Sequence, residues 1–119
     1  MTGRLLITLL ESDMAPRFDL ANEVLIAVWH RAGHLSARRT IVLTRESAED
    51  LCQLILNEDI TAVICGAIEE DYYDYLVWKK IDVFDSVIGP WESALDRFTE
   101  GVLESGTILF DRKGGIEDG

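Results

Sequence analysis

Two short stretches of this chain carry residue types that could bind a ligand. Cys65 and Gly66 end a β-branched apolar run, and Arg17 and Phe18 follow a proline earlier in the chain. A cysteine thiolate is a ligand for soft metals and iron–sulfur clusters, and an arginine holds anions through charge-assisted hydrogen bonds. A glycine at this point would also let backbone N–H groups at the start of a following helix face an anion. These residue types indicate an anion-binding site in which Cys65 is the candidate metal ligand.

Each of these residues also has a purely structural explanation, and the sequence leaves both open. A cysteine that ends a buried strand is a common small core residue, as Cys65 would be. Gly66 can serve only to permit a turn, and Arg17 can be an ordinary surface charge. Trp91 can pack a helix on a sheet or form a platform for a ligand.

The chain lacks the residue patterns of common enzymes. The apolar runs 5–10 and 61–65 contain no carboxylate, so the acids that a two-metal nuclease needs on such strands are missing. No serine–histidine–aspartate spacing, GxGxxG loop or phosphate-binding glycine–lysine loop is present either. We therefore expect a non-catalytic binding protein.

Composition limits the class of protein further. The length of 119 residues predicts a single domain over 1–110, followed by an acidic, frayed tail over 111–119. The formal net charge of −11 argues against a nucleic-acid partner, because phosphates would be repelled. No run of apolar residues is long enough for a membrane span. Two cysteines do not make a disulfide framework, which is typical of a protein of the reducing cytoplasm.

Hydrophobic periodicity predicts eight elements in the order β-β-β-α-β-α-β-α. Strands are expected at 5–10, 24–30, 36–44, 61–65 and 83–88, and a turn is expected at 31–34. Helices are expected from 48 to a stop at 57–59, over 69–80, and from 90 to a stop at Gly106. Such an order closes most simply as a three-layer α/β fold with a five-stranded mixed sheet ordered 3-2-1-4-5 and helices on both faces. This arrangement is the ribonuclease-H-like motif.

The predicted sheet brings three loops together at one edge. Because strands 1, 4 and 5 are parallel, their carboxyl ends meet, and a ligand crevice is expected where the strand order changes direction. The loop over 11–22 would supply one wall, with Ser12, Arg17 and Phe18. Cys65 and Gly66 would form the floor, and Trp91 would lie on the far side.

These stretches resemble a known family. The segments Ala15-Pro16-Arg17-Phe18-Asp19 and Cys65-Gly66-Ala67-Ile68-Glu69 are similar to the two loop motifs of the dinitrogenase iron–molybdenum cofactor biosynthesis family. The segment 90–103, with its Ala94-Leu95-x-x-Phe98 stripe, is similar to the last helix of that family. The chain has Arg17 where the family has a histidine, and Ala67 and Glu69 where it has glycines.

The resemblance implies a ribonuclease-H-like fold and non-catalytic carriage of an iron–sulfur or iron–molybdenum cofactor precursor. By position it implies a site made of Arg17 and Phe18 with Cys65, Gly66 and Ala67. It also implies partners that donate or accept a metallocluster.

A second function stays open, that of a metal-free regulatory or protein-interaction domain. The predicted helix over 69–80 carries four aromatic residues that cannot all face inward from one helix, namely Tyr72, Tyr73, Tyr75 and Trp78. Tyrosine and tryptophan are enriched at protein interfaces. Exposed members of this group would therefore indicate a surface for a protein partner.

Overall fold

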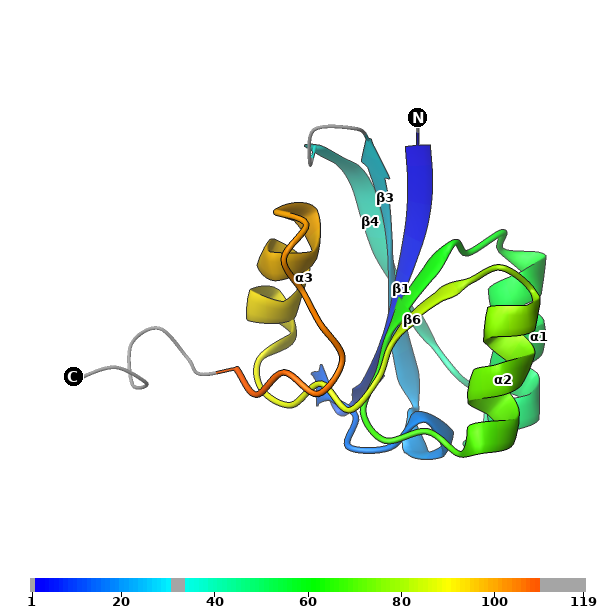
Figure 1. Cartoon of the computed structure of the whole chain (residues 1–119). Helices are drawn as coiled ribbons and strands as arrows, with labels where there is room; N and C mark the ends of the chain where they lie inside the picture. Colours follow the sequence, from blue (N-terminus) through cyan, green and yellow to red (C-terminus); the bar gives the residue numbers. More distant parts are fainter. Residues whose placement is uncertain (1, 31–33, 110–119) are drawn as a thin grey trace.

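A mixed β-sheet runs through the middle of the molecule (Figure 1). The computed structural model describes residues 2–30 and 34–109, and this part of the chain forms a sheet of six strands. The strands are β1 (Thr2–Leu10), β2 (Asp13–Met14), β3 (Glu23–His30), β4 (His34–Val42), β5 (Ala62–Ile64) and β6 (Asp82–Phe84). Five of them follow the order β4-β3-β1-β5-β6, with β1, β5 and β6 parallel. This confirms the predicted order of these five strands, in which β4 is an edge strand.

The sixth strand, β2, corrects the prediction of a five-stranded sheet. It lies inside the segment 11–22, for which the sequence predicts a loop. Glu11 and Ser12 both adopt positive φ, at 51° and 75°, so the chain reverses within two residues. Asp13 and Met14 then pair with Leu10 and Leu9 of β1. Because no glycine marks this turn, its sequence carries no signal of a hairpin.

Two layers of helices cover the sheet. Helices α1 (Ala48–Asn57) and α2 (Glu70–Trp78) lie on one face, and α3 (Trp91–Thr99) lies on the other (Figure 1). Ser47 begins α1 by accepting a hydrogen bond on its Oγ from the Asp50 N–H at 3.2 Å. The fold is therefore α/β with a mixed sheet and three helices, as predicted.

Two element ends differ from the sequence prediction by four residues or more. Helix α3 ends at Thr99 instead of running to Gly106, because Gly101 already adopts a φ of +78°, which stops a helix. Strand β6 ends at Phe84 instead of Ile88, because Ser86 has a φ of 58° and leaves the extended conformation. No described helix is long and apolar enough to cross a membrane. Residues 31–33 of the predicted turn and the predicted tail over 111–119 lie outside the described residues.

The sheet separates two hydrophobic cores because the side chains of a strand alternate between its faces. Leu6 of β1 belongs to the core under α1 and α2, whereas Leu5 and Ile7 belong to the core under α3. Both cysteines, Cys52 and Cys65, are buried in the first core as free thiols.

Candidate functional site

The two stretches with candidate ligand-binding residues lie side by side, as their positions in the sheet predict. The Phe18 N–H donates a hydrogen bond to the Ala67 carbonyl at 2.8 Å, and the Ala67 N–H donates one to the Pro16 carbonyl at 2.9 Å. Arg17 and Ala67 thereby form a parallel β-bridge. The loop after β2 thus extends the sheet beyond the carboxyl end of β5.

Gly66 allows this loop to approach the strand. A Cβ atom at this position would lie 2.3 Å from the Pro16 carbonyl oxygen and 2.6 Å from that of Ala15. Close backbone packing therefore explains the glycine. The predicted floor of the crevice is covered by the backbone of Ala15 and Pro16, and the Ala67 amide already has a partner.

Cys65 is enclosed at this edge. Its relative exposure is 0 %, and burial, with a smaller effect of the Asp85 carboxylate, raises the pKa of its thiol to about 12. A metal binds the thiolate, and a thiol in such surroundings stays protonated at neutral pH. No cluster of three or more His, Cys, Asp or Glu side chains that could hold a metal occurs in residues 2–30 and 34–109. The residues present therefore do not fit a metal or an iron–sulfur cluster ligated by Cys65.

Arg17 is already paired with a carboxylate. Its Nε lies 3.0 Å from Oδ1 of Asp19, and one Nη lies 2.8 Å from Oδ2, so the contact is bidentate. The pair is half-exposed. An anion at this site would have to compete with Asp19 for the guanidinium. Phe18 is buried in the core, and the centre of its ring lies 6.3 Å from that of Tyr72 of α2 with the ring planes tilted by 31°, so its ring is a structural anchor for the loop.

Ser12 and Trp91 do not join Arg17 and Cys65 in a single crevice. Ser12 lies in the β1–β2 turn, where its N–H donates to the Glu23 carboxylate at 2.9 Å. Trp91 packs on the core under α3, on the other side of the sheet from Phe18 and Cys65. The Arg38 guanidinium lies 5.7 Å from the centre of the Trp91 ring. A crevice with Trp91 as its far wall is therefore not formed in this structure.

Thr8 is a residue of this edge that the sequence interpretation passed over. Ile7 pairs with Ile64, so Thr8 and Cys65 are the next residues of neighbouring strands. Thr8 is fully buried, and its hydroxyl makes no hydrogen bond to any part of the chain that the structure describes. The sequence does contain a signal for this residue, because Thr8 is the one polar residue in the apolar run 5–10.

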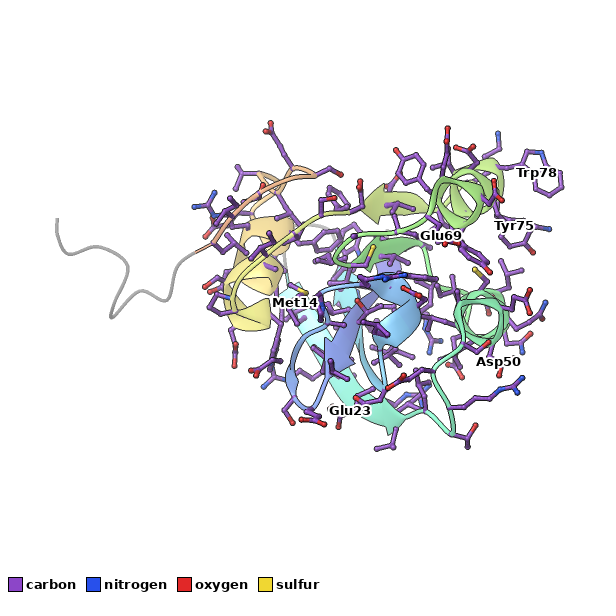
Figure 2. All side chains as sticks on the ribbon, turned by 90° about the horizontal axis from the view of Figure 1, so that it is seen from below. Met14, Glu23, Asp50, Glu69, Tyr75 and Trp78 are labelled. Carbon is purple, nitrogen blue, oxygen red and sulfur yellow. The ribbon has the colours of Figure 1, made fainter. Side chains whose placement is uncertain are left out.

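The outer surface of α2 exposes apolar side chains. Trp78 is 70 % exposed and Val77 is 45 % exposed. Figure 2 shows Tyr75 and Trp78 extending from α2 on the side away from α3. Their rings lie 6.3 Å apart, and the Lys79 ammonium lies 4.9 Å from the Trp78 ring. Tyr72, Tyr73 and Tyr75 are each partly buried, so Trp78 contributes most of the exposed aromatic surface.

A groove of about 310 Å³ separates α1 from α2 beside this surface. Tyr72 and Tyr75 form its apolar side, and Glu49 of α1 and Asp71 of α2 add carboxylates. Burial and then the Glu49 and Glu69 carboxylates raise the pKa of the Tyr72 hydroxyl, as expected in a negative electrostatic field. The groove is suited to a cationic group with an apolar stem.

Comparison with known proteins identifies the fold. The sequence matches no protein-family model, and no curated protein matches it either. Several solved structures are similar in shape. The protein PH0822 has a TM-score of 0.76 at 16 % identity, over 86 % of this chain and 93 % of its own.

Two further similar structures have names that refer to nitrogen fixation. The “putative dinitrogenase (MJ0327)” of Methanocaldococcus jannaschii has a TM-score of 0.71 at 21 % identity, over 87 % of this chain and 94 % of its own. The “putative NifB protein” TM1290 of Thermotoga has a TM-score of 0.62 at 20 % identity, over 94 % of this chain and 99 % of its own. The chain therefore shares its fold, over nearly its whole length, with small α/β proteins of these names.

Proposed function

We propose that this chain is a non-catalytic, nitrogenase-accessory-like domain that works by contacting another protein and ligates no metal itself. The observation that carries this proposal is the exposed C-terminal part of α2, where Val77 and Trp78 lie in solvent and the Trp78 ring lies 6.3 Å from that of Tyr75. Exposed clusters of large apolar side chains mark interaction sites, and tryptophan and tyrosine supply much of the binding energy at protein interfaces.

The acidic residues next to the exposed surface of α2 indicate the charge of a suitable partner. Glu49 and Asp71 line the neighbouring groove, and the whole chain has a formal net charge of −11. A partner that presents lysine or arginine side chains would be attracted and oriented by this field. We infer that the partner surface is basic and that a cationic side chain enters the groove.

The nitrogenase connection is part of the same proposal. Its support is the shared fold with solved proteins named for dinitrogenase and NifB, together with the loop motifs at 15–19 and 65–69. The partner would then be a cytoplasmic protein that donates or accepts a metallocluster, and the domain would be a divergent member of the ribonuclease-H-like cofactor biosynthesis family.

A second candidate function is carriage of a preformed, anionic iron–sulfur or iron–molybdenum cofactor as cargo. The adjacency of Arg17 and Ala67 favours it, because the motif residues do meet at one edge. Cargo binding would require the 15–18 loop to separate from Gly66 and Arg17 to leave Asp19. Each step breaks contacts that the structure contains, which is why the interaction function is preferred.

The interaction function is tested by measuring whether substitutions on α2 abolish the binding of a partner protein. Wild-type protein and the Val77→Ser/Trp78→Ser variant would be immobilised and exposed to a lysate of the source organism. Val102→Ser removes another exposed apolar side chain, 54 % exposed after α3, and is the matched control. A protein with a basic surface, identified by mass spectrometry, that is retained by the wild type and the control but lost with the α2 variant supports the proposal. Equal retention by all three would contradict it.

Anaerobic reconstitution with iron and sulfide tests whether Cys65 of this chain ligates a cluster. The interaction function predicts no visible charge-transfer absorption in the wild type or in Cys65→Ala. Absorption in the wild type that disappears in Cys65→Ala would instead establish a metallocluster carrier with Cys65 as a ligand.

A further inference from the structure

A separate cavity lies on the other face of the sheet. Its volume is about 430 Å³, and α3 and the segment after it cover it. Its lining includes Ala62 and Asp82, the first residues of β5 and β6. The cavity is therefore at the amino ends of the parallel strands, at the opposite edge from Arg17 and Cys65. Its size falls within the usual range of small-molecule sites.

Small residues on the sheet and a fixed group of aromatic rings create this cavity. Trp29 lies directly over Gly3, where a Cβ atom would come within 2.6 Å of the indole ring. Ala62 leaves space on β5, the strand that pairs with β1. Phe98 of α3 packs edge-on against Trp29 at 5.5 Å and against Phe84 at 5.8 Å. The three rings hold one another in place, so the apolar wall is preformed.

The charged residues that line the cavity are both acidic. Asp82 and Glu100 are exposed carboxylates that line it, and none of the described residues that line it is a lysine or arginine. The charged residues of the lining therefore favour a cation and disfavour an anion. Aromatic rings add to this preference, because their faces attract organic cations.

We propose that this cavity binds a small organic cation, an ammonium group on an aromatic or aliphatic body. The body packs against Trp29, Phe84 and Phe98, and the ammonium group lies at the rim between Asp82 and Glu100. This site is independent of the α2 surface and of any metallocluster, because the sheet separates it from both. The proposed function uses no residue of this face of the sheet, so the cation site is additional to that function.

The test is an NMR titration of the full chain with three probes of similar size. Phenethylamine is the cation, phenethyl alcohol is the neutral analogue, and phenylacetate is the anion. We expect saturable shifts of the Trp29 indole N–H and of the Gly101 amide with phenethylamine, weaker shifts with the alcohol and none with phenylacetate. Equal binding of the three probes, or no saturable shift of either signal, would overturn the proposal.

Two double variants test whether binding of the cation requires the Asp82 and Glu100 carboxylates. Asp82→Asn/Glu100→Gln removes both carboxylates of the rim, and because both side chains are exposed the fold should be retained. We expect phenethylamine affinity to fall about tenfold, since each rim ion pair contributes modestly. Glu92→Gln/Asp96→Asn changes the net charge by the same amount on exposed positions of α3 outside the cavity and should leave the affinity unchanged. Equal losses in both variants would show a general charge effect and would reject the site.

Discussion

The Ala67 amide donates a hydrogen bond to the Pro16 carbonyl at 2.9 Å, and this contact closes the edge of the sheet where the sequence predicts a ligand crevice. It joins residues 51 positions apart in the sequence and brings the two family-like motifs into contact. The same contact places the Pro16 carbonyl over Gly66 and leaves Cys65 beneath the loop.

Replacing Gly66 by alanine should destabilise the protein. The new Cβ would lie 2.3 Å from the Pro16 carbonyl oxygen, and this backbone atom cannot move without shifting the loop. We expect Gly66→Ala to lower the free energy of unfolding by about 1–3 kcal/mol, as other overpacked sites do. Urea denaturation followed by circular dichroism measures this change. An unchanged midpoint would mean that the loop does not pack on the strand as described.

Removing the Thr8 hydroxyl should stabilise the protein. Thr8 is fully buried, and its Oγ1 has no hydrogen-bond partner among the described residues. Thr8→Val keeps the shape of the side chain and should raise the free energy of unfolding by about 1 kcal/mol.

Thr61→Val is the matched control for this substitution. The Thr61 hydroxyl accepts a hydrogen bond from the Arg4 N–H at 3.1 Å and donates one to the Arg4 carbonyl at 3.2 Å. Its loss should lower the free energy of unfolding by about 0.5–1.5 kcal/mol. The two variants should therefore shift the thermal midpoint in opposite directions, and a shift of Thr8→Val in the destabilising direction would show that its hydroxyl has a partner.

The stability of the protein should fall at alkaline pH. Burial raises the pKa of Cys65 to about 12 and that of Cys52 to about 11, from an ordinary value of 9.0. As the pH rises above 9, the unfolded chain loses these protons before the native protein does, so the unfolded state is favoured. The stabilisation is complete below pH 9 and is lost progressively as the pH rises toward 11 and 12.

Denaturation midpoints measured from pH 8 to pH 11 test this dependence. Cys65→Ala removes one of the two groups, so its stability should decline less steeply with pH even though its stability at pH 8 is lower. Parallel slopes for the wild type and the variant would indicate that Cys65 is accessible to water.

The Arg17–Asp19 pair should contribute little to stability. The two side chains are 52 % and 35 % exposed, and exposed ion pairs are screened by water and salt. A double-mutant cycle with Arg17→Ala and Asp19→Ala should give a coupling of about 0.2–1 kcal/mol that falls with added salt. A larger coupling that salt does not change would show that the pair is buried in solution.

Local patterns in the sequence determined most of the architecture. Apolar periodicity identifies three helices and the strands β1, β3, β4, β5 and β6, because a half-buried helix and a buried strand impose different spacings on their apolar residues. The parallel arrangement expected of β1 and β5 is enough to predict that Arg17 and Cys65 lie at one edge of the sheet. The short strand β2 has no such signal, because its two-residue turn contains Glu11 and Ser12 in place of glycine.

Only the tertiary structure decided whether that edge is an open site. The burial of Cys65, the pairing of Arg17 with Asp19 and the position of Trp91 behind the sheet depend on which side chains and backbone atoms meet in space. The cavity under α3 depends in the same way on Gly3 and Phe98, which are 95 residues apart. Spacing along the chain determines which face of an element is apolar, whereas the filling of the space between elements depends on long-range packing that has no period in the sequence.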